Sequence, residues 1–148
     1  MEGHIERASI ENIRVGDTAS CQFVVTDQDV QTFSQLSKDN NPLHMDEAFA
    51  KQSGFPGRVA HGMLSLSSIS RLIGTELPGP GSLWISQDVQ FPQPVSPGDT
   101  LIAQVTVKQV SSAAMVVVLT TEVHNVDTDV VVLRGTAKVR IPTPNPAA

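Results

Sequence analysis

The stretch AHGMLSLSSISRLIGTELPGPG, residues 60–81, divides this chain into a helical part and a part made of strands. Residues 60 to about 77 place apolar side chains on more than one side of a helix, with serines between them. A helix of that kind should be enclosed by other structure. The run Pro78-Gly79-Pro80-Gly81 then breaks the helix. We therefore predict a buried central helix that ends at about Leu77.

Beyond this breaker the sequence is rich in β-branched residues or alternates between apolar and polar ones, as strands do. Four strands are predicted, at 83–91, 101–110, 113–123 and 130–141, and an earlier one at 19–25. We interpret the four as an antiparallel meander that the earlier strand joins. One long sheet would then hold the central helix against its concave face.

Two further helices are predicted ahead of the central one. Thr26 can cap a segment from Asp27 to Ser37, in which apolar residues recur at three-residue spacing. Asp46 can cap a short helix that runs through Gln52 and stops before the next glycine. At the other end of the chain, residues 142–148 contain three prolines and are expected to form a loose tail.

The composition fits a single globular domain, residues 1–148, with 40% hydrophobic residues and a net charge of −5. An acidic chain without a Lys/Arg cluster is not expected to bind nucleic acid, since phosphate neutralisation supplies most of that affinity. Cys21 is the only cysteine, which excludes an intrachain disulfide and a Cys-rich metal site. No secretory signal is visible, and the longest apolar run, 113–119, is too short to cross a bilayer. A cytoplasmic protein is expected.

The candidate catalytic residues lie in the segment KDNNPLHMD, residues 38–46. Pro42 removes a backbone donor and favours an extended Asn41, so Asp39, Asn41 and His44 are expected on a turned loop. Such a loop can direct a carboxylate and an imidazole at one shared water, as acid–base catalysis requires. An Asp-x-Asn-Pro segment is also an ordinary turn, whose side chains can bind local backbone groups.

Several motifs follow one another in a definite order. They are Asp39-x-Asn41-Pro42-x-His44, Asp46-x-x-Phe49-Ala50, Phe55-x-Gly57-Arg58-Val59-Ala60-His61-Gly62-Met63, Leu77-Pro78-Gly79-Pro80-Gly81 and Gln87-Asp88-x-x-Phe91. This ordered set resembles the MaoC-type (R)-specific enoyl-CoA hydratases over nearly the whole chain. The resemblance implies an α+β hot-dog fold, in which a curved antiparallel sheet wraps around a long central helix. It also implies a homodimer.

The same resemblance implies a hydro-lyase that interconverts trans-2-enoyl and (3R)-hydroxyacyl thioesters. Asp39 and His44 would hold the catalytic water and transfer protons, and which of them is the base stays open. Asn41 would orient this pair or the thioester, the Gly62 N–H would donate to the thioester carbonyl, and Ser70 would line the pocket. A helix N-terminus suits the role of Gly62, because its free N–H groups and partial positive charge favour an oxyanion. Neither a cofactor nor a metal is implied, since the CoA thioester is the substrate.

His61 is expected to be a structural residue in the first turn of the central helix, bound by backbone groups. A metal site formed by Asp39, His44, Asp46 and His61 is disfavoured, because no two histidines lie four residues apart on a helix. Lys38 stands where relatives commonly have glycine. A positive φ at this position would cost lysine about 1 kcal/mol or more.

Three other roles are compatible with a hot-dog domain. A thioesterase would direct water at the carbonyl carbon, and the spacing of Asp39 and His44 together with the Gly62 region favours the hydratase over it. A non-catalytic acyl-CoA-binding domain would not need these residues together. A dehydratase acting on acyl carrier protein thioesters is not distinguished, because both carriers share the pantetheine arm. The preferred acyl chain length is also left open.

Overall fold

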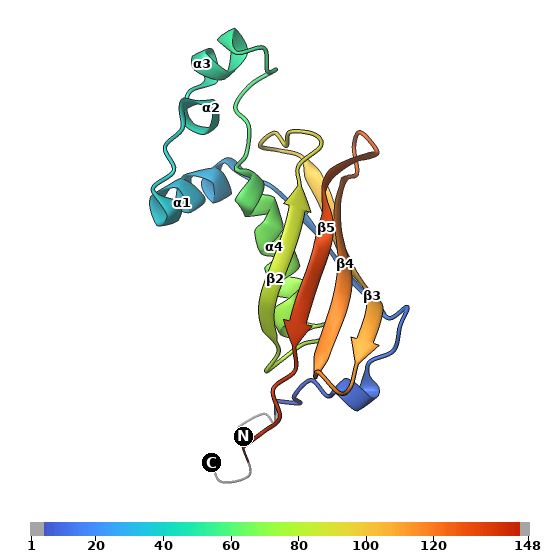
Figure 1. Ribbon diagram of the computed structural model, residues 1–148. Helices are drawn as coiled ribbons and strands as arrows, with labels where there is room; N and C mark the ends of the chain where they lie inside the picture. Colours follow the sequence, from blue (N-terminus) through green and yellow to red (C-terminus); the bar gives the residue numbers. More distant parts are fainter. Residues whose placement is uncertain (1–4, 146–148) are drawn as a thin grey trace.

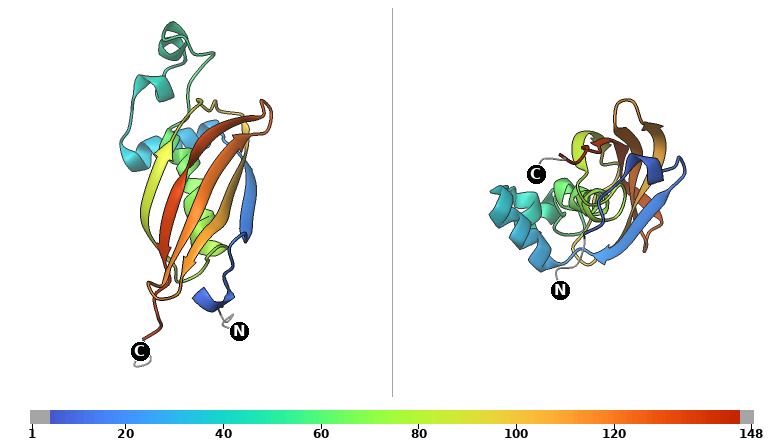
Figure 2. Two further views of the ribbon diagram at one scale, coloured as in Figure 1. Left: turned by 45° about the vertical axis from the view of Figure 1, so that its right-hand side comes forward. Right: turned by 90° about the horizontal axis from the view of Figure 1, so that it is seen from below.

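One five-stranded antiparallel sheet wraps around a helix in the computed structural model, which describes residues 5–145 (Figure 1). The strands are β1 (Thr18–Val24), β2 (Leu83–Gln90), β3 (Thr100–Ser111), β4 (Val116–Asn125) and β5 (Val130–Arg140). Figure 2 shows the central helix, α4 (Gly62–Thr75), lying inside the curve of the sheet. The predicted α+β class and the curved sheet around a central helix are confirmed.

The order of the strands corrects the predicted meander. Strands β3, β4 and β5 follow one another, but β2 lies at the edge of the sheet beside β5, with Gln87 opposite Ala137. Strand β1 pairs with β3 and forms the other edge. Periodicity in the sequence shows which face of a strand is buried, but not which strand is its neighbour. The proline-rich segment 91–99 crosses the end of the sheet instead of closing a tight hairpin between β2 and β3.

The predicted bounds of β4 are also corrected at its start. The strand begins at Val116 and not at position 113, because residues 112–115 form the turn after β3. Met115 has a positive φ of 54° in this turn, and its N–H donates to the carbonyl of Ser112. Apolar character alone does not distinguish such a turn residue from the first residue of a strand.

The helices before α4 lie above one end of the sheet (Figure 1). Helix α1 (Asp27–Ser37) has the predicted bounds, because Thr26 forms a capping box with Asp29. Helix α3 (Glu47–Gln52) is capped by the Asp46 carboxylate, as predicted. Between them is a helical turn that was not predicted, α2 (Pro42–Met45). A short 3-10 turn, Ile10–Asn12, precedes β1.

Helix α4 packs against the concave face of the sheet with Leu66, Ile69, Leu72 and Ile73, all buried. It ends at Thr75, before Leu77, since a residue that precedes proline disfavours the helical conformation. Enclosure of the helix is incomplete within one chain. Met63, Ser67 and Ser70 lie on its exposed side, and Met63 is 56% exposed.

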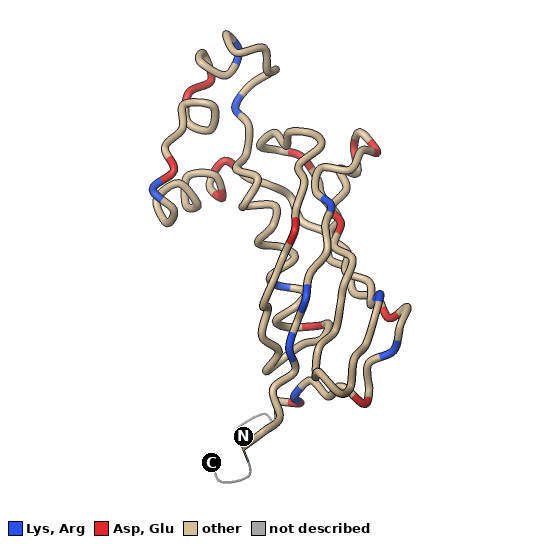
Figure 3. Tube along the Cα trace, in the orientation of Figure 1, with Lys and Arg blue, Asp and Glu red and all other residues tan. Residues whose placement is uncertain are grey.

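Three further predictions concern the surface and the ends of the chain. Residues 142–145 are exposed and carry no helix or strand, while the rest of the predicted tail, 146–148, lies outside the described residues. Basic and acidic residues are interspersed along the trace (Figure 3). Within residues 5–145, no helix combines the length and apolar character needed to span a membrane.

Candidate active site

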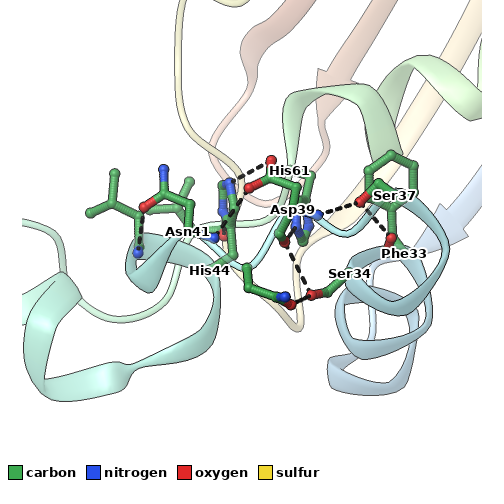
Figure 4. Close-up of polar contacts among 10 residues, drawn as sticks. Phe33, Ser34, Ser37, Asp39, Asn41, His44 and His61 are labelled. Atoms are coloured by element: carbon green, nitrogen blue, oxygen red, sulfur yellow. Dashed lines mark hydrogen bonds and ion pairs between the residues drawn. The ribbon is translucent and has the colours of Figure 1, made fainter.

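Asp39 and His44 meet beside the N-terminal end of α4 (Figure 4). His44 Nε2 lies 3.9 Å from Asp39 Oδ2, which is too far for a direct hydrogen bond. A water oxygen placed about 2.8 Å from each atom fits between them. The His44 side chain is 13% exposed and the Asp39 side chain 51% exposed, so the pair has one part-buried member and one open to solvent. The structure therefore brings the two predicted residues together, and their sharing of one water stays a prediction.

His44 stands on the helical turn α2 and not on an irregular loop, which corrects the prediction for this segment. Asn41 begins the turn as its N-cap, because its Oδ1 accepts from the N–H of Leu43 at 3.1 Å. Pro42 occupies the first helical position, where the missing N–H costs nothing. Asn followed by Pro is a recognisable helix start, so the signal for this turn is present in the sequence.

Asn41 also orients the carboxylate of the pair. Its main-chain N–H donates to Asp39 Oδ1 at 3.1 Å. Since its side chain caps the turn that carries His44, Asn41 contacts or supports both members of the pair. Its predicted role in orienting the pair therefore has a structural basis, whereas contact with a thioester remains a prediction.

The other ring nitrogen of His44 determines which tautomer the neutral ring adopts. Nδ1 lies 2.6 Å from the carbonyl oxygen of Val59. A carbonyl can only accept, so Nδ1 carries the hydrogen and Nε2 of the neutral ring presents a lone pair toward Asp39. Both atoms that face the shared position are then hydrogen-bond acceptors. A water molecule can donate one hydrogen to each of them.

Lys38, which stands where relatives commonly have glycine, has the left-handed conformation, with φ of 64° and ψ of 13°. Its N–H donates to the carbonyl of Ser34 and closes the end of α1. The chain turns here, and the next residue is Asp39. The position of Asp39 therefore depends on an unfavourable backbone conformation, which costs about 1–2 kcal/mol in a residue with a Cβ atom.

His61 forms the N-cap position of α4 and is only 2% exposed. Its Nε2 lies 3.1 Å from the main-chain carbonyl of Asp39, so the expected contact with backbone is present. Its ring also lies against the ring of His44, with centroids 3.9 Å apart and planes at 33°. Sequence reasoning missed this contact, because no local pattern shows which side chains meet across a fold.

A cavity of about 430 Å³ opens beside His44 at the start of α4. It is lined mainly by apolar side chains, including Phe55, Met63, Phe91, Val95 and Val132. Gly62 forms part of its wall, and a Cβ atom there would lie 3.0 Å from the Phe91 ring. The side chain of His61 makes no capping hydrogen bond to α4. Because His44 and Gly62 both line it, the cavity adjoins the His44 ring and the first backbone groups of the helix.

Ser70 is the predicted site residue that a single chain does not bring to the others. It lies two turns further along α4, on the exposed side of the helix. It is not among the residues that line the cavity beside His44. Its place in a substrate pocket stays a prediction and requires another molecule to close that side of α4.

Potential metal-ligand atoms of Asp39, His44 and His61 lie within 4.8 Å of one another. Two ligands of a tetrahedral zinc lie about 3.3 Å apart, given bonds of about 2.0–2.1 Å. His44 and Asp39 are 3.9 Å apart, and the Nε2 hydrogen of His61 is already donated to a carbonyl. Asp46 is committed to capping α3. The cluster suits proton transfer better than metal binding.

Ion pairs attach the segment around α2 and α3 to its neighbours. Glu47 on α3 accepts from Lys51 and from the N–H of Arg58, and these two hydrogen bonds lower its pKa, with that from Lys51 contributing most. The Arg58 guanidinium in turn pairs with Asp27 at the start of α1. On β1, away from the pair, burial raises the pKa of the Cys21 thiol.

Fold and site together define a hot-dog protein with a carboxylate–imidazole pair at the end of its central helix. The MaoC like domain model matches residues 14–128, and the chain belongs to that family. It is 44% identical over 97 residues to the (R)-specific enoyl-CoA hydratase of Rhodospirillum rubrum, covering 66% of this chain and 67% of that protein. It is 35% identical over 134 residues to that of Aeromonas caviae, covering 90% and 99%.

Solved structures show the same fold. The (R)-hydratase from A. caviae superimposes with a TM-score of 0.85 at 35% identity, over 89% of this chain and 99% of that one. The R-hydratase PhaJ1 from Pseudomonas aeruginosa also gives 0.85, at 34% identity, over 93% and 88% of the two chains. The predicted hot-dog fold and the predicted family are thereby confirmed.

Proposed function

We propose that this protein is an (R)-specific enoyl-CoA hydratase, which adds water to a trans-2-enoyl thioester and catalyses the reverse dehydration. The observation that carries the proposal is the pair of acceptors, Asp39 Oδ2 and His44 Nε2, set 3.9 Å apart beside an apolar cavity. The two relatives named above as hydratases support the same reaction. Hydration needs a positioned water and a proton acceptor but no cofactor or metal.

The shared water supplies both the hydroxyl group that bonds to Cβ and the proton that finally reaches Cα. As its oxygen bonds to Cβ, one O–H bond breaks and the proton passes to His44 Nε2, since an imidazole is the stronger base of the two groups. The carboxylate of Asp39 then stabilises the imidazolium. Because neither acceptor carries a proton at the start, the proton that reaches Cα has to be returned by the pair. The addition is therefore expected on one face of the double bond.

The electron pair of the double bond moves toward the thioester carbonyl, where negative charge develops. The start of α4 offers N–H groups and a partial positive charge at that place, and Gly62 permits close approach. In this arrangement the acyl chain occupies the cavity of about 430 Å³. The apolar lining excludes water other than the one that reacts.

The proposed assembly is a homodimer. Strands β1 and β2 are open edges of the sheet, and an open edge needs a partner or a cover. Leu83 and Ile85 on β2 are 53% and 42% exposed, and α4 also has an exposed side among residues 5–145. Pairing of β2 with a second copy would cover these residues. A cytoplasmic setting fits a chain whose single cysteine forms no disulfide.

The test is the addition of purified protein to crotonyl-CoA and to longer trans-2-enoyl-CoAs. We expect loss of the enoyl absorbance and formation of the (3R) product, also in the presence of EDTA. Release of free CoA with the double bond intact would identify a thioesterase instead. The same assay with enoyl thioesters of acyl carrier protein compares the two carriers, and the chain series measures the acyl length that the cavity accepts.

A further inference from the structure

His61 touches both members of the proposed catalytic pair, through different parts of its ring. Its Nε2 hydrogen is donated to the main-chain carbonyl of Asp39, at 3.1 Å, and its ring centroid lies 3.9 Å from the ring centroid of His44. We propose that His61 is a positioning residue that keeps the side chains of Asp39 and His44 in fixed positions relative to each other. This inference rests on the proposed hydratase activity.

The hydrogen bond acts on Asp39 through the main chain. The Asp39 carbonyl accepts from His61 Nε2, and it also lies 3.0 Å from Ser34 Oγ, whose one hydrogen is shared between this carbonyl and Asn40 Oδ1. Ser34 belongs to α1 and His61 stands at the start of α4, which fixes the carbonyl between two helices. The carboxylate itself is half exposed, and Asn41 N–H is its hydrogen-bond donor in the structure. Its direction therefore depends on how firmly the backbone is held.

The ring contact acts on His44. Among residues 5–145, one hydrogen bond, from Nδ1 to the carbonyl of Val59, holds that imidazole, and one such bond leaves the ring free to rotate about it. The neighbouring ring of His61 restricts this rotation, because the two planes lie at only 33° to each other. Phe33 contacts His61 in turn, at 4.9 Å between centroids. His61 is thus itself held by packing and is 2% exposed.

In this proposal His61 positions the pair and does not transfer the proton itself. Since a carbonyl only accepts, Nε2 must carry its hydrogen, and Nδ1 of the neutral ring is a lone pair. This Nδ1 is buried and has no hydrogen-bond partner among residues 5–145. His44 and His61 are therefore opposite tautomers, with the hydrogen on Nδ1 in His44 and on Nε2 in His61. Two substitutions separate the functions of the ring: His61→Phe keeps a ring without a donor, and His61→Gln keeps a donor without a ring.

The experiment compares kcat and KM for crotonyl-CoA in both variants, with His124→Phe as the matched control. His124 lies on β4, where it pairs with Glu122 away from the site. We expect His61→Phe to lose about 10- to 100-fold in kcat, as the loss of a supporting hydrogen bond does, with KM changed less than about threefold. His61→Gln should lose less than about tenfold, and His124→Phe nothing. Thermal unfolding and circular dichroism check that each variant is folded.

A second measurement does not depend on activity. The chain has four histidines, so ¹⁵N-labelled rings give a spectrum in which His44 and His61 can be assigned. The wild type should show opposite tautomers for the two, and His44 signals should shift or broaden in His61→Phe and His61→Gln. Unchanged His44 signals in both variants, or full kcat in both, would overturn the positioning role while leaving the hydratase proposal intact. An inactive wild type would instead overturn the hydratase proposal, and the spectrum would still test the contact.

Discussion

Two main-chain contacts set the chemistry of the proposed site at the scale of single residues. The carbonyl of Val59 fixes the tautomer of His44, and the N–H of Asn41 binds the carboxylate of Asp39. Together they leave two acceptors facing one water position. The sequence predicted that these side chains would meet, because they are close in the chain. It could not predict the ring contact between His44 and His61, since only the fold brings these two distant residues together.

Lys38 offers a test of stored backbone strain. Replacing Lys38 by glycine should raise the free energy of unfolding by about 1 kcal/mol, because glycine adopts a φ of 64° without the Cβ clash. In a chain of this size that is a rise in Tm of about 2–4 °C. Lys51→Gly in α3 is the matched control and should destabilise by about 1 kcal/mol. Thermal unfolding of both variants decides, and equal losses of stability would show that Lys38 is not strained.

Gly62 tests the space at the start of α4. In Gly62→Ala the new Cβ meets the Phe91 ring at 3.0 Å, so the ring has to move in the cavity beside His44. We expect a loss of about tenfold or more in kcat/KM, since a misplacement of about 1 Å can cost about 10²-fold. Gly74→Ala, in the same helix, has nothing within 4 Å of the new methyl group. It should keep its activity and gain about 0.5–1 kcal/mol of stability. Equal kinetics for both variants would remove the argument for Gly62.

At the scale of helices and strands, the quality of the sequence prediction follows the strength of local signals. Both ends of helix α1 were predicted correctly, because Thr26 and Asp29 form a capping box that the sequence shows. Helix α4 begins two residues later than predicted, at Gly62. The turn α2 was missed although Asn41 and Pro42 mark its start. The position of β2 beside β5 had no local signal at all, because pairing between distant strands is decided by packing.

The cap of α1 bears on the site, because Ser34 on this helix contacts the Asp39 carbonyl. Thr26→Ala removes the side-chain half of the capping box and should lower the free energy of unfolding by about 1 kcal/mol. Urea titration measures this as a lower midpoint with an unchanged slope. Thr75→Ala, at the C-terminal end of α4, is the comparison. The Thr75 hydroxyl donates only to the carbonyl of Arg71 in the same helix, so its loss should change the free energy of unfolding much less. A larger effect at position 75 would contradict the assignment.

At the scale of the whole molecule, the edge strands β1 and β2 and the exposed side of α4 lack a cover among residues 5–145. We expect a homodimer, with a mass of twice 15.8 kDa in light scattering at micromolar concentration. Ile85→Lys on β2 should shift the protein toward the monomer, since a charge on an edge strand opposes pairing. Ser70 would meet the partner on this model, which explains why a single chain leaves it exposed. A monomeric wild type would refute the pairing and the pocket role of Ser70 together.

The central claim is that Asp39 and His44 act as a unit on one water, and kcat for crotonyl-CoA hydration by three variants tests it most directly. Asp39→Asn and His44→Gln should each lower kcat by about 10²–10⁴-fold while the protein remains folded. The double variant should be hardly slower than the worse single one, because the two groups serve one proton transfer. Near wild-type kcat in both single variants, or a double variant as slow as the product of the two losses, would contradict the account.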